Sequence, residues 1–365
     1  MAKRATIENR EFDMNRLGYI DALRGWAILG VVSSHVAQNV GRLPRGISIF
    51  AGAGPMGVAL FFIISAFTIF ITLDQKKNDS KERINFFFTK RFLRIAPMYY
   101  LAILYYAIVS WLSEGKIDYT GLFSNVFFLH GLSPAKINSF VPGGWSITVE
   151  IFFYCLIPLI IRSINNFNQA ITFLLISYVI RYAAIQITGN IIGSEGRNGQ
   201  YLYLFFPNQL PLFAIGVILF FHIIKKEKIK VSGYNLICIG VLLIISLAFR
   251  QYQLLFEEHL LYAYCFGAAT IFMSRIKTLL LDNRIIRFIG KISYSMYIIH
   301  FIVLFWLSRF HLNSLYEGSA GVNYILFFLL TLSICSLISF VTYRMVERPF
   351  QNLGKKIISK QVKTA

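Results

Sequence analysis

Long apolar stretches recur along the whole chain, and short polar segments separate them. Each stretch reaches or approaches the ~20 residues that a helix needs to cross the hydrocarbon core of a bilayer. The pattern predicts an all-α fold, a polytopic membrane bundle of about ten transmembrane helices. The expected spans are 18–38, 55–73, 97–113, 143–161, 170–188, 206–224, 233–249, 258–274, 292–309 and 322–344.

One further apolar segment, 120–131, is too short to cross, and we expect it to be re-entrant or interfacial. Lys and Arg indicate the orientation, because they are enriched in cytoplasmic loops. With the N-terminus inside, the inner segments hold 27 of the 36 Lys and Arg residues, the outer segments hold 7, and two lie within spans. Both termini are therefore predicted to be cytoplasmic.

The domain organisation follows from the spans. We expect 1–17 to be a cytoplasmic N-terminal segment, 18–350 to form the transmembrane domain, and 351–365 to be a basic cytoplasmic tail. This bundle uses nearly the whole chain, so any chemistry is expected inside it.

Composition narrows the class of protein further. Apolar residues make up 56% of the chain and charged residues 15%, against about 25% charged in soluble domains. A net charge of +19 in a soluble protein would suggest a nucleic-acid partner. No recognised nucleic-acid module occurs here, so we expect membrane lipids, and no nucleic acid, as partners. The histidines are scattered without metal-ligand spacing, and no metal is predicted.

The first span carries three polar residues that are costly inside a bilayer. Asp21 and Arg24 are three residues apart and share a helix face, so they could form an ion pair at the interface. The depth of Arg24, about two turns from the cytoplasmic end, favours a functional role. His35 lies eleven residues further, about 16 Å along the axis. It is either an interhelical hydrogen-bonding group or a base for a hydroxyl proton.

The fourth span begins with a polar turn that contains Trp145 and Ser146, and Glu150 follows one turn later. Ser146 and Glu150 share a helix face. The predicted topology puts Glu150 at a depth similar to that of His35, which suggests a base and a residue that orients it. The alternative is an ion pair between Glu150 and a helix arginine such as Arg181.

Two arginines lead into the third span. Arg91 and Arg94 are three residues apart and would face one way on a helix. Guanidinium groups bind phosphate in a bidentate manner, so this pair could hold an anionic cytosolic ligand. The alternatives are an ordinary positive flank and a contact with anionic lipid headgroups.

Six segments of the chain form an ordered set of motifs. They are Tyr19-Ile20-Asp21-Ala22-Leu23-Arg24-Gly25 with His35, then 57–67, 88–100, Trp145-Ser146-Ile147-Thr148-Val149-Glu150, 293–300 and Glu347-Arg348-Pro349-Phe350. With these six segments the chain resembles the membrane-bound acyltransferase family 3, and the resemblance covers almost the full chain. One departure from that family is visible, since it commonly has Ser-Gly-Phe where this chain has Ser65-Ala66-Phe67.

The resemblance implies transfer of an acyl group, usually acetyl from acetyl-CoA, to a hydroxyl of a cell-envelope glycan in a bacterial cytoplasmic membrane. Acyl-CoA and a glycan or lipid-linked glycan are the implied partners. Arg24, Arg91 and Arg94 match positions that would hold the acetyl-CoA donor. His35 would be a general base or a transient acyl carrier, and Glu150 would orient it or bind the sugar. Trp145 and Ser146 match the motif that shapes the acceptor side. Some members of that family carry a further extracytoplasmic domain, and we expect this chain to act alone or with a separate partner.

A secondary transporter or a flippase for a lipid-linked glycan is the main alternative, because it would share the span count, the charge bias and the intramembrane polar residues. An internal repeat and broken helices would favour it, and no repeat is evident in the sequence. A non-catalytic scaffold would explain neither His35 nor the arginine pairs.

Overall fold

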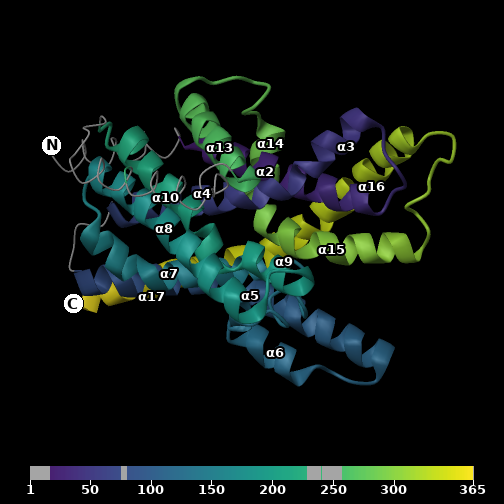
Figure 1. The fold of residues 1–365 in the computed structure, drawn as a ribbon, viewed down its shortest axis with the longest axis horizontal. Helices are drawn as coiled ribbons and strands as arrows, with labels where there is room; N and C mark the ends of the chain where they lie inside the picture. Colours follow the sequence, from purple (N-terminus) through teal and green to yellow (C-terminus); the bar gives the residue numbers. More distant parts are fainter. Residues whose placement is uncertain (1–16, 75–79, 228–239, 241–256, 365) are drawn as a thin grey trace. The chain divides into compact units, whose positions relative to one another are not determined.

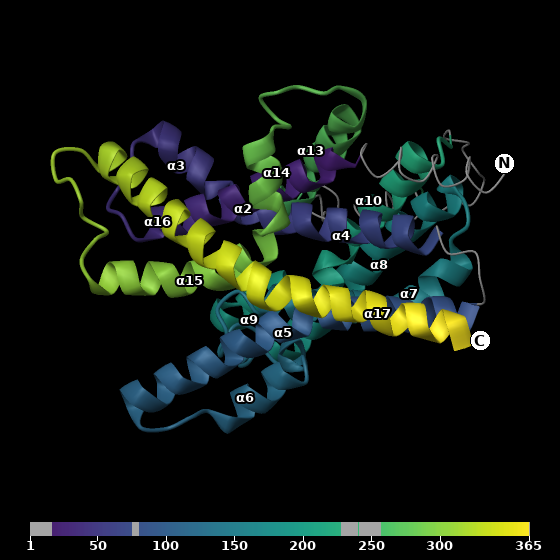
Figure 2. The same cartoon turned by 180° about the vertical axis from the view of Figure 1, so that it is seen from behind.

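The structure, a computed structural model, describes residues 17–74, 80–227, 240 and 257–364. Every regular element within those residues is a helix (Figures 1 and 2). The first part contains α2 (Gly18–Gln38), α3 (Arg45–Gly52), η1 (Gly54–Met56), α4 (Gly57–Asp74), α5 (Ser80–Glu114), α6 (Tyr119–Val126), η2 (His130–Leu132), α7 (Trp145–Ser163) and α8 (Phe167–Ile192). The second part contains α9 (Gly196–Leu204), α10 (Phe206–Leu219), η3 (Phe220–Ile224), α13 (Glu258–Arg275), α14 (Arg284–Lys291), α15 (Ser293–Arg309), α16 (Ala320–Thr342), η4 (Tyr343–Glu347) and α17 (Arg348–Thr364).

Six of the described helical stretches are long and apolar enough to cross a membrane. A seventh is formed if α14 and α15, which bend by 76° at a short break, are taken as one span. The all-helical membrane fold is thus confirmed, whereas the count of ten spans and the orientation of the termini stay predictions. The six are Arg45–Asp74, Ile84–Glu114, Trp145–Ser163, Phe167–Ile192, Gly196–Ile224 and Ala320–Ile357.

The remaining predicted spans have different outcomes. The segment 18–38 is helical as α2 and 258–274 lies in α13, but neither is among the six. In α2 the polar residues of the first and last turns lower the mean hydropathy. The segment 233–249 lies outside the described residues, apart from position 240. The short segment 120–131 contains only most of α6 and the start of η2, so no crossing helix forms there.

The chain divides into two compact units, each built from two stretches of sequence. Unit 1 contains the residues up to 64 and 264–341, and unit 2 contains 65–263 and the residues from 342 onward. His35 and Arg24 therefore belong to unit 1, whereas Arg91 and Glu150 belong to unit 2. Each unit is described by itself below.

In unit 1, α14 crosses α2 with the two backbones in contact. Two glycines permit this approach. A Cβ atom at Gly25 would lie 2.3 Å from the carbonyl oxygen of Ile286, and one at Gly290 would overlap the carbonyl oxygen of Asp21. The indole of Trp26 also donates a hydrogen bond to the carbonyl of Leu281, over 2.9 Å. The crossing fixes the part of α2 that carries Asp21 and Arg24.

In unit 2, α10 packs against α8 and α7, and α17 lies along α5 (Figures 1 and 2). The rings of Phe153 and Phe213 stack with centroids 4.1 Å apart between α7 and α10. Gly354 of α17 faces Leu93 of α5. The predicted basic tail is thus helical as far as residue 364 and begins inside α17.

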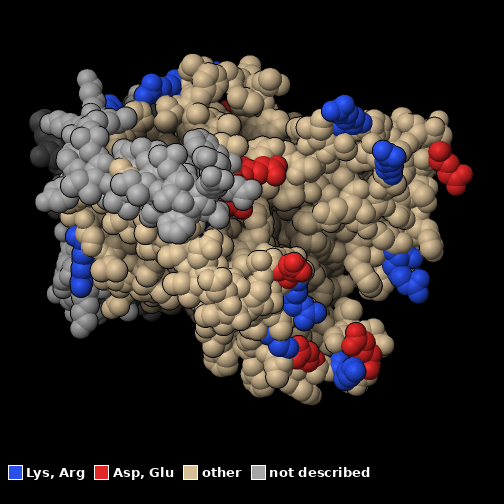
Figure 3. Space-filling model, in the orientation of Figure 1, with Lys and Arg blue, Asp and Glu red and all other residues tan. Residues whose placement is uncertain are grey.

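Charged side chains are few on the face shown in Figure 3, and most of the described surface on that face is uncharged. Many large apolar side chains of the long helices are exposed, for example Leu104 and Trp111 in α5 and Ile187 in α8. Exposed apolar side chains in this number are stable when they face lipid. The surface therefore agrees with a multi-pass membrane protein.

Candidate active site

The predicted ion pair of α2 is present in unit 1. Arg24 Nη1 lies 3.6 Å from Asp21 Oδ1, across one turn of the helix. The side chain of Arg24 is 15% exposed and that of Asp21 29%. A carboxylate in the first turn also interacts favourably with the helix dipole. Asp21 thus compensates the charge of Arg24 in part, and the guanidinium keeps some accessible surface.

His35 lies in the last turn of α2 and is half-buried. Its Nδ1 is 3.2 Å from Oε1 of Gln38, and its ring centroid is 4.5 Å from that of Phe301 in α15. An amide oxygen only accepts hydrogen bonds, so this contact places the proton of a neutral imidazole on Nδ1. Nε2 then carries the lone pair that a general base requires.

The end of α2 is held by a polar network centred on Asn39. Asn39 Nδ2 donates to the carbonyl of His35 over 2.8 Å. Ser308 Oγ donates to Asn39 Oδ1 over 3.1 Å, and Asn313 Nδ2 donates to the Asn39 carbonyl over 3.0 Å. The network satisfies carbonyl groups that a helix end leaves without partners. It therefore fixes the backbone from which the His35 ring projects.

A second histidine, which the sequence analysis did not single out, lies beside His35. His300 of α15 is fully buried, and the two ring centroids are 5.3 Å apart. The available sequence signal was a lone histidine within an apolar span, at the end of the motif 293–300. Such a histidine is often only a hydrogen-bonding group of the core, so the sequence alone did not distinguish a structural histidine from one beside a site residue.

Glu150 accepts two hydrogen bonds inside unit 2. Ser65 Oγ of α4 and the hydroxyl of Tyr154, one turn later in α7, both donate to Oε1, the latter over 2.5 Å. Arg181, the helix arginine considered as a partner of Glu150, has other partners. Arg181 pairs with Glu257, and its Nε donates to Asn208 Oδ1 over 2.7 Å.

Arg91 joins the Glu150 cluster, which we define as Ser65, Arg91, Glu150 and Tyr154. The guanidinium carbon of Arg91 lies 5.5 Å from the centroid of the Tyr154 ring and interacts electrostatically with Glu150. Arg91 is 7% exposed, whereas Arg94 is half-buried. Arg91 thus packs among the helices of unit 2, whereas Arg94 keeps more accessible surface. The binding of one anionic ligand by both arginines stays a prediction.

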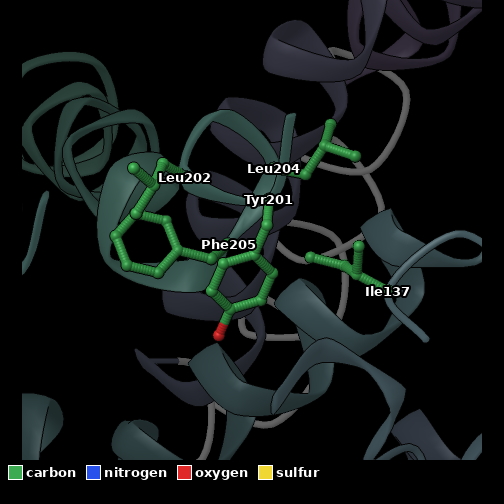
Figure 4. Close-up of a cluster of buried hydrophobic side chains, with 5 residues drawn as sticks. All are labelled: Ile137, Tyr201, Leu202, Leu204 and Phe205. Carbon is green, nitrogen blue, oxygen red and sulfur yellow. The ribbon is translucent and has the colours of Figure 1, made fainter. Parts of the chain in front are cut away.

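Trp145 and Ser146 form the first turn of α7. Ser146 is buried and its Oγ donates to the carbonyl of Gly143 over 3.0 Å. Gly143 adopts a positive φ of 77°, which a glycine tolerates. Trp145 packs against a cluster of buried apolar side chains. Figure 4 shows the members of this cluster. That cluster consists of Ile137, Tyr201, Leu202, Leu204 and Phe205.

The connection before α7 positions this turn. His130 is buried, and its Nε2 lies 3.0 Å from the carbonyl oxygen of Gly144. Burial lowers the pKa of His130, so the neutral ring is favoured.

Earlier in the same connection, Asp118 caps α6 by accepting a hydrogen bond from the backbone N–H of Gly121. Lys136, 2.7 Å away, and further hydrogen bonds hold the pKa of Asp118 well below its usual range. Paired charged side chains are visible near α6 in Figure 3.

A family model described as an acyltransferase domain matches residues 17–344. The chain belongs to this acyltransferase family. The match includes Arg24, His35, Arg91, Arg94 and the α7 segment, which lie in the motifs that first indicated the family.

Similar curated proteins come from Staphylococcus aureus. One of strain COL, named "Putative O-acetyltransferase", is 24% identical over 376 residues, which cover 93% of this chain and 58% of that protein. The O-acetyltransferase OatA of strain NCTC 8325 is 23% identical over 381 residues, which cover 92% of this chain and 57% of OatA. This chain thus spans less than two thirds of the length of these relatives. No solved structure matches it.

The predicted site residues therefore lie in two sets. Arg24, about two turns into α2, and His35, in its last turn, belong to unit 1. Unit 2 contains Arg91, Arg94, Trp145, Ser146 and Glu150. The structure brings Arg91 and Glu150 into one cluster, which the sequence did not predict. Tyr154, Ser65 and His300 are among the polar residues that the structure adds to the predicted site residues.

Proposed function

We propose that this protein is an integral membrane O-acetyltransferase that transfers an acetyl group from acetyl-CoA to a hydroxyl of a cell-surface glycan. The glycan could be a lipopolysaccharide O-antigen, a capsule or an exopolysaccharide, and the membrane the bacterial cytoplasmic membrane. Membership of the acyltransferase family, together with the O-acetyltransferase names of its relatives, supports the reaction class. The observation that carries the mechanism is the half-buried His35, with its ring held at the end of α2.

In this proposal His35 acts as the general base. The acceptor hydroxyl gives its proton to His35 Nε2 while its oxygen attacks the thioester carbonyl of the donor. The carbon–sulfur bond then breaks, an oxygen ester remains on the acceptor, and the CoA thiolate takes the proton from His35. Nucleophilic attack by His35 itself, with an acyl-imidazole intermediate, is the alternative order of steps. The proposal assigns no role to a metal.

The cationic residues are assigned to the donor, whose phosphates carry negative charge. Arg94 and Arg91 of α5 would hold phosphate groups, and Arg24 would hold the diphosphate or the pantetheine arm. Trp145 and Ser146 would shape the acceptor site, with Glu150 binding a sugar hydroxyl. The partners are therefore acyl-CoA, a glycan or lipid-linked glycan, and membrane lipids.

The test is transfer of a labelled acetyl group by the purified protein in detergent. Wild-type protein is expected to transfer or hydrolyse acetyl-CoA, and His35→Ala to lose more than about 99% of the rate, since general-base catalysis contributes ~10²–10⁴-fold. Equal expression and an equal thermal midpoint must accompany that loss. Activity of His35→Ala near the wild-type level would show that His35 is structural and that this mechanism is wrong.

A transporter or flippase is the second candidate, because the bend of 76° between α14 and α15 resembles the broken helices of secondary transporters. Uptake or flipping of a lipid-linked glycan in liposomes without any acetyl transfer would favour that function. Acetyl transfer by the purified protein would exclude it as the sole activity.

A further inference from the structure

The orientation of the His300 ring is fixed within unit 1. Its Nδ1 lies 2.7 Å from the carbonyl oxygen of Tyr297. Because a carbonyl oxygen only accepts hydrogen bonds, Nδ1 carries the proton and Nε2 carries the lone pair. Among the described side chains, none is hydrogen-bonded to Nε2, although His300 is 0% exposed.

A buried nitrogen without a hydrogen-bond partner is unfavourable, because its desolvation is not compensated. Stability alone therefore does not explain this imidazole, because an apolar side chain of similar volume would avoid the cost. The neighbouring ring of His35 gives an explanation. The rings of His35 and His300 lie 5.3 Å apart, and both contact the ring of Phe301, with centroids 4.5 and 4.1 Å away.

We propose that His300 is a positioning residue for His35. The lone pair on Nε2 of His300 stabilises the protonated ring of His35. The proposal rests on the proposed function, in which His35 takes the hydroxyl proton and returns it to the CoA thiolate. Between these two steps His35 is a cation in a region of low dielectric constant, where an oriented dipole has a strong effect. His300 neither gains nor loses a proton, since the Tyr297 carbonyl keeps its Nδ1 proton in place.

Three substitutions distinguish an effect of the Nε2 lone pair from an effect of the volume of the ring. His300→Asn retains a donor at the position of Nδ1 but has no atom at the position of Nε2. His300→Gln places an amide oxygen near the position of Nε2, and His300→Met fills the volume without a strong acceptor. The control is Thr331→Val in α16, which removes a different buried polar atom, a hydroxyl without a hydrogen-bond partner in the described part of unit 1.

The measurement is kcat and KM for acetyl transfer, together with the thermal midpoint in detergent. We expect His300→Asn and His300→Met to lower kcat about tenfold or more while KM stays within about twofold, since charge stabilisation acts in the transition state. His300→Gln is expected to recover a large part of kcat, and Thr331→Val to match wild type. If His300→Asn does not fold, the comparison of kcat between His300→Met and His300→Gln still tests the inference.

Two results would overturn this inference. One is a wild-type kcat in His300→Asn or His300→Met, and the other is an equal loss in the Gln and Met variants, which would indicate packing alone. His35→Ala separates the inference from the proposed function. If His35→Ala is inactive while His300→Met is fully active, only the role of His300 is wrong. If His35→Ala is active, the proposed mechanism fails as well.

Discussion

The hydroxyl of Tyr154 donates a hydrogen bond to Oε1 of Glu150, one helical turn earlier in α7, over 2.5 Å. Ser65 donates to the same oxygen from α4, and Arg91 of α5 lies beside the Tyr154 ring. A carboxylate inside a bundle is tolerated when donors and an opposite charge compensate it. The cluster therefore holds Glu150 in one orientation.

Replacing Tyr154 by Phe tests this orientation. The substitution removes one donor to a charged acceptor, a bond that contributes about 1.5–3 kcal/mol in typical cases. We expect a lower thermal midpoint in detergent and a transfer rate reduced by about tenfold. Tyr106→Phe in α5, where the ring contacts that of Tyr105, is the control. Unchanged activity of Tyr154→Phe would show that the orientation of Glu150 does not matter for transfer.

The arginines of α5 are expected to differ when each is replaced by Ala. Arg94 is half-buried and free to meet a ligand phosphate, so Arg94→Ala should raise KM for acetyl-CoA by about tenfold with little change in kcat. Arg91→Ala leaves Glu150 without its nearby cation and should also lower stability and kcat.

Steady-state kinetics at two salt concentrations check this difference, because salt screens phosphate contacts at accessible sites. Lys90→Ala, next to Arg91 but over the ring of Phe86, is the matched control. If KM for acetyl-CoA changes neither with salt concentration nor in the Arg94→Ala variant, a phosphate site at this position is contradicted.

Gly290→Ala is expected to disturb the crossing of α2 and α14. The added Cβ would overlap the carbonyl oxygen of Asp21, so the helices must move apart. Overpacking of this kind costs about 1–3 kcal/mol, and it displaces Arg24 as well. We expect a lower thermal midpoint and weaker donor binding. Gly46→Ala in α3, where a Cβ has open space, should leave both unchanged or gain slightly in stability. Equal midpoints for the two variants would mean that α14 is not tightly packed on α2.

Donor and acceptor are expected to reach α2 from opposite ends. Arg24 and His35 are eleven residues apart on this helix, about 16 Å along its axis, and CoA phosphates cannot enter hydrocarbon at tolerable cost. Sealed, oriented vesicles provide the measurement, with acetyl-CoA at the cytoplasmic face only and a membrane-impermeant glycan at the outer face only. Product is expected in that arrangement. Product formed only when both substrates are cytoplasmic would contradict the expectation.

Part of the fold was predictable because it depends on local sequence. The apolar stretches predicted helices. Wherever an expected span lies within the described residues, the structure has a helix there. The pair Asp21 and Arg24 was predictable because a spacing of three places two side chains on one helix face. The motif order indicated the family that residues 17–344 match.

Contacts between helices were not predictable in the same way. Glu150 was predicted to orient His35, with an ion pair to a helix arginine such as Arg181 as the alternative. In the structure it interacts with Ser65, Tyr154 and Arg91, from elements whose packing no local pattern defines. The burial of Arg91, with Arg94 only half-buried, also depends on how α5 packs, although both residues lie on one helix.

Local patterns were therefore sufficient to predict the all-helical membrane class and the candidate residues, because hydrophobic runs and residue spacing along one helix are local properties. The order of the motifs along the chain indicated the family. Only the tertiary structure placed His300 beside His35 and assembled the Glu150 cluster. Those contacts join residues separated by 265 positions in the first case and by 85 between Ser65 and Glu150. The side chains that surround a buried polar group are set by helix packing, and its physical role follows from those neighbours.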